Sequence, residues 1–224
     1  MRDRRAVTLI ELMVGMSLVL VLTGVAFSLF QVSTDAFRIS LMRQDLQTAA
    51  RQILGRLEQE LRVTSLESLS VGDAPIRSQT VDGAQARRHM LCMASISDWN
   101  DLSLYDANTG SPLWNRYVLY YATLETPNAH LFRLELDPAS SASVPWTSFA
   151  TLVPPDQLPT SPFAGASVTR KQVLSADVFE FTVIPDDKAL RCSLKLRRQE
   201  SARMGGIKAR DEVFQLEIEA RPRN

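Results

Sequence analysis

One acidic residue is notable for its position in the chain. Glu11 borders a long apolar segment, and the next charged residue after it is Asp35. An ionised carboxylate inside a bilayer costs on the order of a few kcal/mol at the centre and less near the edge. An acid at this position therefore needs a partner, and we expect Glu11 to have one of positive charge.

The other polar side chains do not form a recognisable catalytic or metal-binding set. The two histidines, His89 and His130, lack partners at metal-ligand spacing, and we expect each to occupy a strand or turn with a satisfied ring. Nucleophile-elbow, phosphate-loop and zinc-protease motifs are absent from the sequence. Residues 106–110 (DANTG) share features with a calcium loop, but the remaining ligands are missing, so we interpret them as an Asx turn. We predict a protein that is not an enzyme, with no metal and no cofactor.

The cysteines leave two interpretations open. Cys92 and Cys192 are the only two in the chain, and their separation excludes a CxxC redox or zinc motif. If this region lies outside the cytoplasm, the two thiols could form a disulfide. Otherwise they would serve as small buried apolar residues.

Charge argues against a dedicated nucleic-acid-binding protein. Lys+Arg and Asp+Glu both number 25, so the formal net charge is zero. Residues 195–210 (KLRRQESARMGGIKAR) form a basic segment that could contact DNA or a protein partner, or could be a solvated hairpin. We favour the hairpin because no aromatic residue interleaves the basic ones, which weakens binding of single strands by stacking.

The N-terminal segment has the length of a membrane span. From Leu12 to Phe30 the chain carries no charge over about 19 residues, which as a helix would extend about 30 Å. Residues 1–5 are net basic, which places the N-terminus in the cytoplasm. No small-x-small cleavage site follows the run, so a membrane anchor fits better than a removable secretory signal.

A second helical pattern follows directly, and strand patterns follow that. Between residues 34 and 66, apolar residues recur every three or four positions: Ile39, Met42, Leu46, Ala49 or Ala50, Ile53, Leu57 and Leu61. Beyond this, six β-rich segments lie at 89–96, 116–123, 131–136, 178–184, 190–197 and 213–220. Short turns between several of them predict antiparallel pairing, and the Pro/Ser-rich residues 137–169 predict a loop. We expect an α+β fold with a long N-terminal helix packed on an antiparallel sheet.

The residues around Glu11 resemble a known processing motif. Ala6–Val14 (AVTLIELMV) is similar to the prepilin cleavage and methylation motif of type IV pilins and type II secretion pseudopilins. The resemblance implies cleavage between Ala6 and Val7 by a prepilin peptidase, followed by N-methylation of Val7. It also implies that Glu11 is an assembly contact, pairing with the freed amine of Val7 on a neighbouring subunit. The sequence departs from the family pattern at two positions, with Ala6 where Gly is usual and Val7 where Phe is usual.

The later segments are similar in character to PilW-like minor pilins and J-type type II secretion pseudopilins. This resemblance implies a pilin-like fold with four parts: a cytoplasmic leader (1–6), a transmembrane half-helix (7–33), an amphipathic half-helix (34–66) and a β-rich head (67–224). The single-pass protein would lie in the inner membrane with its head in the periplasm, and would then move to a filament at the cell surface.

The resemblance implies a structural function. The chain is expected to be a minor pilin or pseudopilin that helps to initiate or assemble a filament for pilus biogenesis, DNA uptake or type II secretion. Its expected partners are other pilin or pseudopilin subunits, the prepilin peptidase, the inner-membrane assembly platform and membrane lipid. Two alternatives are a filament-mounted adhesin or DNA-binding module, and a periplasmic enzyme with an uncleaved anchor. The enzyme alternative lacks a catalytic constellation and leaves Glu11 unexplained.

Overall fold

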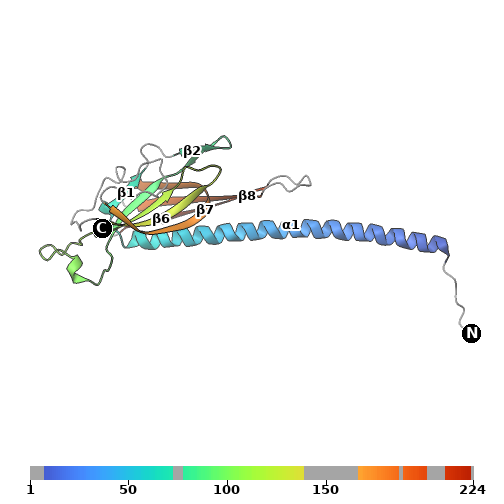
Figure 1. The fold of residues 1–224 in the computed structure, drawn as a ribbon, viewed down its shortest axis with the longest axis horizontal. Helices are drawn as coiled ribbons and strands as arrows, with labels where there is room; N and C mark the ends of the chain where they lie inside the picture. The colour runs from blue at the N-terminus through green and yellow to red at the C-terminus, as the bar shows by residue number, and fades with distance from the viewer. Residues whose placement is uncertain (1–7, 73–77, 139–165, 187–188, 201–209, 223–224) are drawn as a thin grey trace, which may run out of the picture. The chain divides into compact units, whose positions relative to one another are not determined.

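The computed structural model describes residues 8–72, 78–138, 166–186, 189–200 and 210–222 (Figure 1). The leader and the predicted cleavage position lie outside these residues. The chain divides into two units, Met1–Gln44 and Asp45–Asn224, and we describe each by itself.

A single helix, α1 (Leu9–Arg62), runs through both units. It contains no proline, and several of its hydroxyl side chains donate to carbonyls one turn earlier, as Thr23 does to Val19 at 2.7 Å. Such back-bonding satisfies a hydroxyl that has no other polar neighbour. The predicted continuous helix is therefore confirmed, and it is long and apolar enough to cross a membrane by length and composition.

In the first unit the apolar side chains of α1 are exposed around the helix. Leu20 is 72% exposed and Phe30 is 68% exposed. A helix that is apolar on all sides suits an apolar environment, either lipid or neighbouring helices.

In the second unit α1 packs on a seven-stranded antiparallel sheet of order β1-β4-β5-β6-β7-β8-β9 (Figure 1). A separate hairpin is made of β2 and β3, joined through Asp82 and Gly83, which adopt positive φ angles of 51° and 80° as a two-residue hairpin turn requires. The strands are β1 (Leu69–Gly72), β2 (Ser78–Val81), β3 (Ala84–Arg87), β4 (Met90–Ser95), β5 (Arg116–Ala122), β6 (Ala129–Pro138), β7 (Ala166–Asp186), β8 (Ala189–Glu200) and β9 (Arg210–Ala220). Two short 3-10 helices are η1 (Leu66–Ser68) and η2 (Leu102–Leu104).

The sheet curls, because the residues just before β4 reach back to the second half of β7. The amide of His89 donates to the carbonyl of Phe181 at 2.9 Å, and Arg88 forms a bridge with the same residue. Register shifts along the pairings of β7 with β6 and with β8 allow these strands to bend.

The core lies on both faces of the sheet. The buried face of α1, which includes Leu46, Ile53 and Leu57, packs on one face. The other face carries Cys92, Tyr117 and their neighbours, and it is covered in part by Trp114 from the connection between β4 and β5. Alternate residues of β4 belong to the two clusters, as strand geometry requires.

These observations confirm the predicted α+β class and correct two details. β1 and the hairpin of β2 and β3 were not predicted from the sequence. Residues 137–169 were predicted to form a loop, whereas β6 extends to Pro138 and β7 begins at Ala166. The first half of β7 is rich in polar residues, so the β-pattern of its second half did not extend into it.

Candidate functional site

The N-terminus of α1 is closed by a reciprocal pair of side chains. The backbone amide of Thr8 and its hydroxyl donate to Glu11 Oε2 at 2.9 and 3.0 Å, and the amide of Glu11 donates to Thr8 Oγ1 at 3.4 Å. This is a capping box, which satisfies amides that have no partner inside the helix. The role of Thr8 was not predicted from the sequence, although the T-x-x-E spacing of Thr8 and Glu11 is the usual signal of a capping box.

The predicted cationic partner of Glu11 is not tested by this arrangement. Val7, whose freed amine would supply the charge, lies outside the described residues, and so does Ala6. The capping box does show that the carboxylate points back toward the chain entering the helix, because both of its donors belong to Thr8. Val7 immediately precedes those donors.

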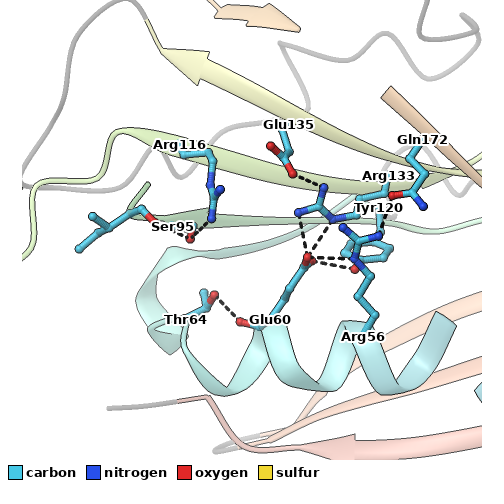
Figure 2. A network of polar contacts seen from close by, with 10 residues as sticks. Arg56, Glu60, Thr64, Ser95, Arg116, Tyr120, Arg133, Glu135 and Gln172 are labelled. Carbon is cyan, nitrogen blue, oxygen red and sulfur yellow. Dashed lines mark hydrogen bonds and ion pairs between the residues drawn. The ribbon is translucent and has the colours of Figure 1, made fainter. Parts of the chain in front are cut away.

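A second polar site fixes the end of α1 to the sheet (Figure 2). Glu60 accepts hydrogen bonds from Tyr120 Oη at 2.7 Å, Arg133 Nε at 2.8 Å and Arg56 Nε at 3.4 Å. Arg133 has only 4% of its side chain exposed and also pairs with Glu135. This network joins α1 to β5 and β6.

The protonation states in this network follow from burial and pairing. Burial favours a lower pKa for the Arg133 guanidinium, but hydrogen bonds and charges from Glu60 and Glu135 outweigh it and raise the pKa. Burial, and then the neighbouring charge of Glu60, raise the pKa of Tyr120, so its hydroxyl stays protonated and donates. The network is therefore a set of salt bridges and hydrogen bonds that holds α1 against β5 and β6, and we refer to it as the polar clasp.

The histidines and the predicted Asx turn lie in structural positions. His89 is buried, with its Nδ1 3.0 Å from the carbonyl oxygen of Val183. His130 lies beside Glu125, with Nδ1 and Oε2 2.5 Å apart. The carboxylate of Asp106 accepts the amide of Asn108 at 3.0 Å, which confirms the Asx turn. Within the described residues no group of three or more potential ligands could hold a metal ion.

Two arginines of the predicted basic segment are used inside the head. Arg197 pairs with Asp211 at 2.5 Å and with Asp82 in the turn between β2 and β3. Arg198 pairs with Asp177 at 2.7 Å and with Asp45 of α1 at 3.4 Å. The carboxylates neutralise these charges, which favours the hairpin interpretation over a DNA contact at this pair. Residues 201–209 of the segment lie outside the described part of the chain.

The two cysteines are free thiols in this structure, and both are buried. Cys92 of β4 belongs to one core cluster and Cys192 of β8 to the other, and β5, β6 and β7 separate their strands in the sheet. Burial raises the pKa of Cys192 to about 12 and raises that of Cys92 as well. This arrangement favours two small buried apolar residues over a disulfide between Cys92 and Cys192, and the disulfide stays untested.

Comparison with known proteins identifies the N-terminal segment. Residues 1–27 match the family model of the prokaryotic N-terminal methylation motif. Searches of curated proteins and of solved structures found no match. The chain therefore carries the N-terminal methylation motif of type IV pilin-like proteins, followed by a pilin-like fold in which a long helix packs on a curled antiparallel sheet.

Proposed function

We propose that this protein is a minor pilin or pseudopilin, a structural subunit that helps to initiate or assemble a type IV pilus-like filament. One observation carries the proposal: the methylation motif lies at the start of a helix whose first part is apolar and exposed, and whose last part is built into a folded head. Proteins with such a motif are processed by a prepilin peptidase and assemble with other pilins, and are typically structural subunits without enzymatic activity.

The proposal includes a maturation step between Ala6 and Val7. Cleavage there would convert the amide nitrogen of Val7 into a free amine, and methylation would leave that amine able to carry a positive charge. The apolar segment would stay on the mature protein and hold it in the inner membrane before assembly, with the head in the periplasm. Residues 7–33 would then be the transmembrane half of the helix, 34–66 the amphipathic half and 67–224 the head.

The carboxylate of Glu11 would be the contact between subunits. A charged group near the membrane edge is stabilised by an opposite charge, and the amine of Val7 on an adjacent subunit has the required sign. Thr8 holds the Glu11 carboxylate at the helix terminus. This is the end of the helix where an incoming amine would lie.

The proposal is tested by replacing Glu11 with Leu in a strain that lacks the native copy. Membrane insertion should persist because the segment becomes more apolar, while the amount in sheared filaments should fall about tenfold or more, which corresponds to the loss of about 1.4 kcal/mol or more of contact free energy. The matched control is Glu58→Leu, which removes a partly exposed carboxylate of the same helix. Equal incorporation of both variants would contradict the role proposed for Glu11.

Maturation is tested separately by intact mass. Protein from the native host should lack residues 1–6, with or without one methyl group, and Ala6→Lys should block the cut. Full-length chain in assembled filaments would overturn the maturation step and leave the head's structure unaffected.

The alternative of a DNA-binding module is not favoured by the described residues. Arg197 and Arg198 of the basic segment are paired with carboxylates of the same chain.

A further inference from the structure

The connection between β4 and β5, residues 96–115, presents apolar side chains to solvent; we refer to it as the β4–β5 loop. Leu102 is 84% exposed, more than any other large apolar side chain described in the second unit, and Trp99 is 38% exposed. A single exposed leucine is common on protein surfaces and explains nothing by itself. The contacts that hold the loop and the charges that surround Leu102 therefore decide whether its exposure has a function.

The loop has a defined conformation that keeps Leu102 outward. The Asp101 carboxylate caps η2 by accepting from the amide and the hydroxyl of Ser103 at 2.9 and 2.7 Å. Tyr105 Oη donates to the carbonyl oxygen of Trp99 at 3.0 Å. The backbone amide of Leu113 donates to the carbonyl oxygen of Leu104 at 2.8 Å.

The base of the loop is tied to the core. Ile96 and Trp114 are buried in the cluster on the sheet face away from α1, and Leu104 packs against the same cluster. Since Leu104 points inward within η2, Leu102 is left on the outside. A loop whose backbone is ordered before binding loses less conformational entropy when one of its side chains enters a pocket.

The loop is also acidic. Asp98, Asp101 and Asp106 lie in it, and it contains no Lys, Arg or His. A hydrogen bond from the Ser103 hydroxyl lowers the pKa of Asp101, and one from the Asn108 amide lowers that of Asp106. Both carboxylates are therefore ionised at neutral pH. Such a surface repels phosphate groups, which disfavours nucleic acid and anionic lipid as partners.

We propose that the β4–β5 loop is a docking surface for a protein partner, with Leu102 entering an apolar pocket that is bordered by Lys or Arg side chains. Apolar anchors surrounded by charged residues are typical of specific interfaces, and Trp is enriched among the residues that dominate them. The charge of the loop selects a basic rim on the partner. The inference uses the head alone and does not depend on the proposed role in a filament.

The experiment places a photo-crosslinking amino acid, p-benzoylphenylalanine, at Asn100 of the full chain in its native host. Asn100 is exposed between Trp99 and Asp101, and only its backbone amide is used in the loop, donating to Asp98. Crosslinked peptides are then identified by mass spectrometry. We expect an adduct with another protein whose crosslinked surface carries Lys or Arg.

Two variants and one control test the chemistry. Leu102→Ser should reduce the adduct about tenfold, as loss of an anchor residue does. Asp98→Asn combined with Asp101→Asn keeps the hydrogen-bond acceptors and should also reduce the adduct several-fold by removing charge. Ile184→Ser, at another exposed apolar side chain of the head, should leave it unchanged. Thermal unfolding of each variant verifies that the head stays folded.

Four results would overturn the proposal: no adduct, an adduct only with a second copy of this chain, an adduct only with lipid or nucleic acid, and a protein adduct that Leu102→Ser and the Asn variants do not reduce.

Discussion

The two parts of α1 differ in the exposure of their apolar side chains, although they form one helix. Within residues 9–44, large apolar side chains such as Leu20 are exposed around the helix, and the first unit supplies no core for them. From Asp45 to Arg62 the apolar side chains lie on one face, and Leu46 and Leu57 are buried against the sheet. The stability of the head should therefore depend on the second part and be nearly insensitive to the first.

The largest expected effect comes from a matched pair of truncations in these two parts. Leu57→Ala should destabilise the head by about 3–4 kcal/mol, because Leu57 is 0% exposed and its removal leaves a cavity. Leu20→Ala should change the unfolding of the head by less than about 0.5 kcal/mol. Urea denaturation of the full chain in detergent, followed by the fluorescence of buried Trp114, measures both. Similar losses for the two variants would show that the parts are energetically coupled.

A smaller effect is expected from the polar clasp at the end of α1. Glu60→Leu should cost about 2–3 kcal/mol, because it removes one of the two carboxylates paired with the buried guanidinium of Arg133 and leaves the Tyr120 hydroxyl without its acceptor. Glu58→Leu breaks only the exposed pair with Arg62 and should cost at most about 1 kcal/mol. The same denaturation assay compares them, and equal costs would refute the special role of the clasp.

Acid should weaken the head through its paired carboxylates. Burial opposes ionisation of Glu135, but the hydrogen bond and charge of Arg133 outweigh it, and the pKa of Glu135 lies below its ordinary value of 4.5. A carboxyl with a lower pKa in the folded state stabilises the fold while ionised, and this stabilisation is lost as pH falls through the folded pKa. The free energy of unfolding should thus decrease as pH falls below about 4.5, and less steeply in Glu135→Gln. A variant that follows the wild-type pH dependence would exclude Glu135 as a contributor.

The smallest expected effect concerns the chemical reactivity of the two buried thiols. Burial keeps Cys92 and Cys192 protonated at neutral pH, and only the thiolate is a good nucleophile. Protein from the native host should therefore contain two free thiols that an alkylating reagent modifies only after unfolding. Non-reducing mass spectrometry measures this directly. A disulfide between them would require the head to differ in the arrangement of β4 and β8.

Parts of the molecule could be predicted from local sequence alone. Burial of apolar side chains follows the period of the backbone, so a pattern over a few helical turns or one strand is enough to predict it. This was the case for the apolar run, for the periodic spacing of Leu46, Ile53 and Leu57, and for the β-rich segments. The same holds for the methylation motif around Val7 and Glu11, where a short stretch of residues suffices for recognition.

Only the tertiary structure decided which polar groups meet. Glu60 and Arg133 are 73 positions apart, and Arg197 reaches Asp82 across 115 positions, so no local period relates them. The first half of β7 is a strand because it pairs with β6, although its own residues are largely polar. Exposure of Leu102 was likewise unpredictable, since Leu102 and Leu104 are the same residue type and the fold of the loop alone turns one outward and the other inward. The spacing of residues that are close in sequence determines which apolar side chains are buried. The pairing of charges and strands depends instead on how distant segments are brought together.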